Sequence, residues 1–146
     1  MTIWKWSFVI AVGLFLFSLG HYVPVGAQES GEVPKIILSG LEAYKAEGAE
    51  AAIKAWIKDS SIEGSKDALS QANVLRTVQD YYGAYKTFDV IRTRNLSPTT
   101  RVIYMILDYE KGPLFSKFVV YRAEKGWVLT MFTFNTKEEL IVPACP

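Results

Sequence analysis

Residues 101–135 read RVIYMILDYE-KGP-LFSKFVVYR-AEKG-WVLTMFTFN, where the hyphens set three apolar runs apart from two short turns. The runs are rich in Val, Ile, Tyr and Phe, which β-strands favour. An earlier run of the same kind covers Phe88–Thr93 and leads into residue 101 through a turn at Leu96–Thr99. Connections this short join antiparallel neighbours. We therefore expect a four-stranded antiparallel meander.

Two helical segments precede these strands. Apolar residues recur at helical spacing from Lys35 to about Lys58, where Gly48 marks either a break or a close contact. A second helix is predicted over Lys66–Tyr85, with Ser65 as its N-cap. Helices first and strands afterwards indicate an α+β fold in which N-terminal helices pack on a curved four-stranded antiparallel sheet.

The first 27 residues have the three parts of a secretory signal peptide. Lys5 gives a positive start, Phe8–Phe17 is an apolar middle, and Val25–Ala27 supplies small residues for cleavage. The alternative is an uncleaved anchor, but the apolar run from Trp6 to Leu19 is shorter than the roughly 20 residues that span a bilayer. We expect cleavage after Ala27, export to the periplasm or extracellular space, and no stable membrane span afterwards.

The expected organisation after the signal peptide is a flexible linker at residues 28–34, one domain at 35–142 and a tail at 143–146. The only cysteine, Cys145, lies in this tail, so no internal disulfide can form. It is either a thiol on a frayed tail or the site of an intermolecular disulfide.

Charge and histidine content exclude several function classes. The chain has 16 Lys and Arg against 15 Asp and Glu, and this balance argues against nucleic-acid binding, which needs a basic surplus. The one histidine, His21, would leave with the signal peptide. Histidine-based catalytic triads, Cys-His catalysis and histidine metal sites are then excluded. We predict no metal site and no cofactor.

Both faces of the predicted sheet carry apolar side chains, although two helices can cover only one face. Strand side chains alternate between faces. In the last strand, alternation places one set on one face and the other set opposite: Trp127, Leu129, Met131 and Thr133 against Val128, Thr130, Phe132 and Phe134. The second face is covered either by a second copy, which gives a homodimer through the sheet, or by the first helix or the tail at Leu140–Val142.

Several segments together resemble one known superfamily. They are the end of the first helical segment (Ala55–Lys58), the residues before the first strand (Tyr82–Gly83) and one hairpin turn (Tyr109–Pro113). The start of the last strand (Gly126–Trp127) and its end (Phe132–Thr136) complete the set. The layout resembles the NTF2-like (cystatin-like) superfamily, within which it is similar to small exported proteins of unknown function. The resemblance covers residues 35–142 and implies a cone of helices and curved sheet around an apolar pocket. That superfamily includes enzymes, binding modules and dimeric carriers.

Aromatic residues are the candidate ligand contacts, because aromatic rings supply apolar area and often a polar tip. The predicted binding set is Trp56, Tyr82, Tyr85, Tyr104, Phe118 and Trp127. For each of them the competing interpretation is ordinary core. A small apolar ligand or a protein partner, bound in the cone pocket or on the sheet face, is the expected target. No catalytic residue is assigned.

Two further groups of residues offer alternatives. The resemblance also implies a lyase or isomerase of ketosteroid-isomerase type, with a base among Asp80, Asp89 and Asp108 and an oxyanion donor among Tyr82, Tyr85 and Tyr104. Separately, Arg92, Arg94 and Arg101 surround one predicted turn. They form either an anion site or a solvated hairpin end.

Overall fold

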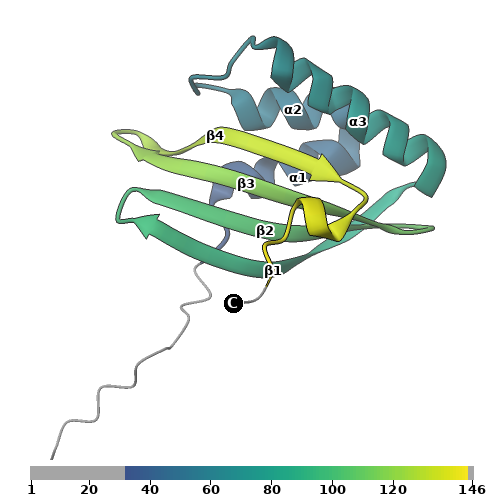
Figure 1. Cartoon of the computed structure of the whole chain (residues 1–146). Coiled ribbons are helices and arrows are strands. Elements are labelled where there is room, and N and C mark those ends of the chain that lie inside the picture. The colour runs from purple at the N-terminus through teal and green to yellow at the C-terminus, as the bar shows by residue number, and fades with distance from the viewer. Residues whose placement is uncertain (1–31, 145–146) are drawn as a thin grey trace, which may run out of the picture.

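The computed structural model describes residues 32–144 and confirms the predicted α+β fold (Figure 1). Three helices come first, followed by one four-stranded sheet and a short 3-10 helix, Glu138–Leu140. The predicted signal peptide at residues 1–27, most of the linker and Cys145 lie outside the described residues. Within residues 32–144 no helix combines the length and apolar character needed to cross a bilayer.

The helices are α1 (Lys35–Glu47), α2 (Ala49–Ile57) and α3 (Lys66–Tyr82). Gly48 has a φ of 93°, a left-handed conformation that favours glycine, so the helix breaks there, as one of the two predicted alternatives, and the first helical segment is two helices. The predicted N-cap is confirmed, since the Ser65 side chain accepts a hydrogen bond from the Ala68 N–H. α3 ends three residues earlier than predicted because Gly83, at φ 83°, closes it by donating to the Gln79 carbonyl.

The strands are β1 (Tyr85–Ser97), β2 (Thr100–Tyr109), β3 (Pro113–Ala123) and β4 (Gly126–Asn135). They pair antiparallel in the order β1-β2-β3-β4, which confirms the meander. β1 is longer than predicted at both ends. Its pairing with β2 contains three register shifts, each of which bends the strand locally.

A bulge in β4 overturns the predicted division of its side chains between two faces. Val119 pairs with Met131 while the next residue, Val120, pairs with Leu129, so Thr130 is an extra residue. The Thr130 hydroxyl donates to the Val119 carbonyl at 3.1 Å. Because an extra residue reverses the alternation, Leu129 and Phe132 lie on the same face, the one that meets the helices.

The core fills the space between the helices and the inner face of the sheet. Trp56 is fully buried there, and its indole N–H donates to the Ile37 carbonyl at 2.9 Å. Gly40 on α1 faces this ring so closely that a side chain there would overlap it. α1 and α2 therefore pack together where α1 has a glycine, Gly40, and α2 has its largest side chain, Trp56.

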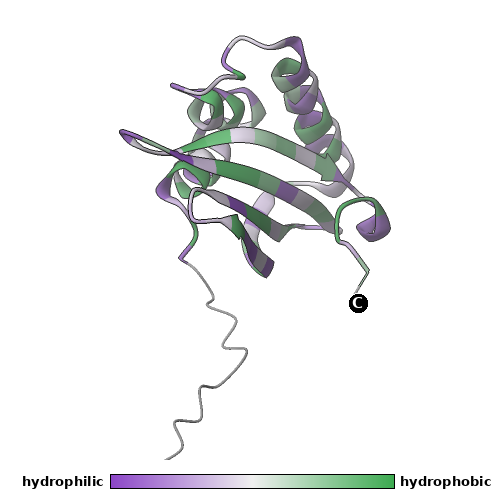
Figure 2. Ribbon diagram, turned by 60° about the vertical axis from the view of Figure 1, so that its left-hand side comes forward, coloured by the Kyte–Doolittle hydropathy of each residue, from purple (hydrophilic) through white to green (hydrophobic). Residues whose placement is uncertain are grey.

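The outer face of the sheet is covered in part by the end of the chain. Ile141 is buried against Val102 and Tyr104 of β2, with Phe115 and Val119 of β3 packed beside them. The tail therefore supplies part of the cover that the sequence required, as one of the two alternatives predicted. Figure 2 shows the 3-10 helix, hydrophilic in colour, beside strands that carry long hydrophobic stretches.

Candidate functional site

The structure divides the six predicted ligand contacts among four places. Trp56 and Phe118 lie in the centre of the core, both with no exposed surface. Tyr82 and Tyr85 lie at one end of the sheet, where α3 passes into β1. Tyr104 is buried on the outer face under Ile141, and Trp127 lies at the β3–β4 hairpin. The six do not share one cavity.

Aromatic rings occupy the centre of the cone. The Trp56 ring lies 5.2 Å from that of Phe118 and 5.7 Å from that of Phe134, measured between centroids. Phe132 joins the same group, with its ring centroid 5.8 Å from that of Phe134. These are the distances of packed aromatic pairs. The predicted contacts Trp56 and Phe118 therefore act as core residues in this structure.

A cluster of four tyrosines closes the end of the cone near α3. The Tyr44 and Tyr109 hydroxyls lie 2.8 Å apart, and the Tyr44 hydroxyl also donates to the Leu75 carbonyl at 3.3 Å. Since a hydroxyl has one proton, Tyr109 must be the donor to Tyr44. Tyr85 stacks on Tyr44 at 5.2 Å, and Tyr82 packs against the edge of Tyr109 at 6.4 Å.

The environment of this cluster keeps the hydroxyls of Tyr44, Tyr85 and Tyr109 protonated. Burial raises the pKa of Tyr44, and it raises that of Tyr109 further, where the hydrogen bond given to Tyr44 adds to the effect. Burial, with the electrostatic influence of Tyr44 and Asp108, raises the pKa of Tyr85 to about 12. Neutral, mutually bonded hydroxyls of this kind stabilise the fold. The pairing of Tyr44 with Tyr109 was not foreseen, because the two are far apart in the sequence.

The three candidate acids lie away from the interior of the cone. Asp80 and Asp89 are exposed. Asp108 is half-buried and alternates with Leu107 and Tyr109, which places its side chain on the outer face. Among the residues that the structure describes, no group of three or more acidic, cysteine or histidine side chains could hold a metal ion.

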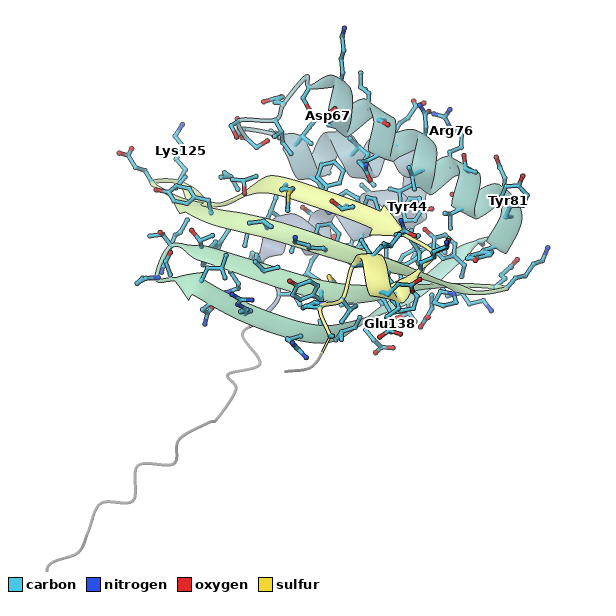
Figure 3. All side chains as sticks on the ribbon, in the orientation of Figure 1. Tyr44, Asp67, Arg76, Tyr81, Lys125 and Glu138 are labelled. Carbon is cyan, nitrogen blue, oxygen red and sulfur yellow. The ribbon has the colours of Figure 1, made fainter. Side chains whose placement is uncertain are left out.

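An open groove of about 740 Å³ lies at the opposite end of the sheet, where α1 begins. Its walls come from the start of α1, the start of β2 and the β3–β4 hairpin: Glu32–Ile36, Ser39, Arg101 and Lys125–Trp127. Figure 3 shows Lys125 at that hairpin, far from Tyr81 at the end of α3. The volume is within the range of small-molecule sites, roughly 300–1,000 Å³.

A second groove of about 610 Å³ adjoins the first and shares Ile36 and Lys125–Trp127 with it. The rest of its lining is Lys58, Asp59, Ala123, Glu124 and Val128. Trp127 lines both grooves and is half-buried, with its inner side packed on the core. The two grooves together, called here the Trp127 groove, form one continuous open concavity around the Trp127 ring.

Two arginines lie against the Trp127 ring. The Arg101 guanidinium carbon is 4.9 Å from the ring centroid and that of Arg122 is 5.9 Å from it, both within cation–π range. Arg101 is also held by two hydrogen bonds, from Nε to the Asn95 side chain at 2.9 Å and from Nη1 to the Glu32 carbonyl at 3.3 Å. The Trp127 ring therefore forms an aromatic surface beside the positive charge of Arg101, which these hydrogen bonds hold in place.

The sequence identified Trp127 and Arg101 separately but did not bring them together. The sequence pattern groups Arg101 with its neighbours Arg92 and Arg94 around one turn. The register places Arg94 opposite Val102, on the outer face, whereas Arg101 extends to Trp127 on the inner side. The contribution of Ile36 and Lys125 had no signal in the sequence, because it depends on where α1 begins relative to the β3–β4 hairpin.

Comparisons with known proteins give one distant likeness. No family model matches the chain, and no curated protein matches it. Among solved structures, a domain of unknown function with a cystatin-like fold from Nostoc punctiforme PCC 73102 is similar over 70% of each chain, with 13% sequence identity and a TM-score of 0.43.

Proposed function

We propose that the protein is an exported, non-catalytic binding module of NTF2-like type that holds a small ligand with an apolar body in the Trp127 groove. The observation that carries this proposal is the position of Trp127, whose half-buried ring forms a wall of both open grooves. The centre of the cone favours no ligand, because Trp56 and its aromatic neighbours pack against one another there. Binding at the mouth of the cone is therefore the function that the geometry supports best.

A neutral apolar fluorescent probe, N-phenyl-1-naphthylamine, tests this proposal on purified protein. Trp127→Ala removes the aromatic wall, and we expect the probe's affinity to fall about tenfold, since ring–ring contacts contribute about 0.5–1.5 kcal/mol beyond buried area. Tyr121→Ala is the matched control, because Tyr121 is an exposed aromatic residue on the outer face of the neighbouring strand. Circular dichroism checks that both variants are folded. Unchanged affinity in Trp127→Ala would contradict the proposal.

Export rests on residues 1–27 and has its own test. Cleavage after Ala27 predicts that protein isolated from its source begins at Gln28. Intact-mass spectrometry of that material measures the start directly, and the same spectrum reports any small molecule that remains bound. Material that still begins at Met1 in the cytosol would contradict export and leave the groove unaffected.

A homodimer through the outer sheet face is the second candidate arrangement. The tail covers Val102 and Tyr104, but Tyr121 and Met131 stay 45% and 40% exposed on the same face. Exposed apolar side chains on a sheet favour association. Light scattering should give the mass of two subunits, and Met131→Glu should return it to one. A single-subunit mass at high concentration would contradict the dimer.

A further inference from the structure

The Trp127 groove is unevenly charged. The half nearer the start of α1 is lined by Lys35, Arg101 and Lys125 against the single carboxylate of Glu32. The other half balances Lys58 and Lys125 against Asp59 and Glu124. The chain as a whole is close to neutral. Positive charge is therefore concentrated at one end of the groove, and the other end is electrically balanced.

Among the described residues, the positive side chains of this half form no ion pair. Within residues 32–144 the one ion pair joins Arg76 to Glu50, on the helices. Arg101 uses two of its five N–H donors on Asn95 and Glu32, and the others have no protein acceptor among the described residues. A half-buried guanidinium that is fixed in position but not neutralised favours an anion.

We propose that the ligand of the Trp127 groove is a small organic anion with an apolar body. The inference rests on the proposed function and adds the chemical class of the ligand. Its acidic group binds Arg101, with Lys35 and Lys125 beside it, and its apolar body lies along Trp127 and Ile36 toward the balanced half. Arg101 supplies direction as well as charge, because its two protein hydrogen bonds fix the plane of the guanidinium.

Two probes that differ by one acidic group test the proposal. 1-Anilinonaphthalene-8-sulfonate is N-phenyl-1-naphthylamine with an added sulfonate, so the ratio of their affinities measures the net effect of the acidic group. We expect the sulfonate to bind about tenfold more tightly, because a charge-assisted hydrogen bond at a partly exposed site contributes toward the lower end of its usual range. Raising the salt concentration should lower the affinity for the sulfonate and leave the affinity for the neutral probe unchanged.

Arg101→Met is the diagnostic variant, since methionine keeps an apolar side chain and removes the charge. The affinity ratio should fall about tenfold in Arg101→Met and stay at the wild-type value in Arg94→Met. Arg94 is an exposed arginine of the same hairpin that faces away from the groove. Circular dichroism and the neutral probe check that the groove is still intact.

The outcomes separate the two proposals. A ratio near one in the wild type, or a ratio that Arg101→Met leaves unchanged, overturns the anion assignment while the binding function stands. Equal losses in Arg101→Met and Arg94→Met also overturn it, because they indicate a response to overall charge. If neither probe binds the wild-type protein, the proposed function fails and the anion assignment fails with it.

Discussion

Gly40→Ala should destabilise the protein, although alanine favours helices more than glycine does. A Cβ atom at position 40 would lie 1.9 Å from Nε1 and 2.1 Å from Cδ1 of Trp56, which is far inside contact distance. Trp56 must move, and it then loses its hydrogen bond to the Ile37 carbonyl. Overpacking costs about 1–3 kcal/mol and the lost hydrogen bond about 1 kcal/mol, while the helix gains about 1 kcal/mol.

The expected net loss in the free energy of unfolding is thus about 2 kcal/mol, measured by urea denaturation followed by circular dichroism. Ser39→Ala, one residue earlier and exposed, is the control and should change stability by less than about 0.5 kcal/mol. In a Trp56→Phe background the cost of Gly40→Ala should shrink, since a smaller ring leaves room. A stabilised Gly40→Ala protein, or an equal cost in both backgrounds, would refute the assigned contact.

Three other changes test the tyrosine cluster and the tail. Tyr109→Phe should cost about 1 kcal/mol in urea denaturation, because Tyr44 loses a donor but keeps its own bond to a carbonyl; no loss would contradict that pairing. The folded-state pKa of Tyr85 is raised to about 12 from its ordinary value of 10.0, so its contribution to stability is fully present below pH 10 and lost as the pH rises toward 12; thermal melts across that window should show falling stability, and a flat profile would contradict it. Ile141→Ala should cost about 2 kcal/mol by uncovering Tyr104, and an unchanged urea midpoint would mean that the tail does not pack there.

Local sequence patterns predicted the order and type of the elements because each pattern acts over a few residues. The break at Gly48 and the cap at Ser65 are such local effects, and both were visible in the sequence. The faces of β4 were assigned wrongly because Thr130 forms a bulge, which depends on its hydrogen bond to β3. One extra residue in a strand moves every side chain beyond it to the opposite face of the sheet.

The candidate site was predictable in its residue types and not in its geometry. Aromatic residues are easy to find in a sequence, but the core and the groove contain the same types of aromatic residue. Trp56 is buried where α1 and α2 cross, whereas Trp127 is half-buried at the sheet end, and only the packing of α1 distinguishes them. The association of Arg101 with Trp127 depends on strand register, which turns and bulges set together.

The irregular pairing of β1 bears on how the protein avoids aggregation. β1 is an edge strand, and an edge strand offers unpaired backbone groups to which another chain can add. Its three register shifts break that row into short, differently oriented pieces, and Lys86, Arg92 and Arg94 place positive charge along it. Two molecules that meet at this edge cannot form a continuous ladder and also repel each other, which disfavours association through this edge.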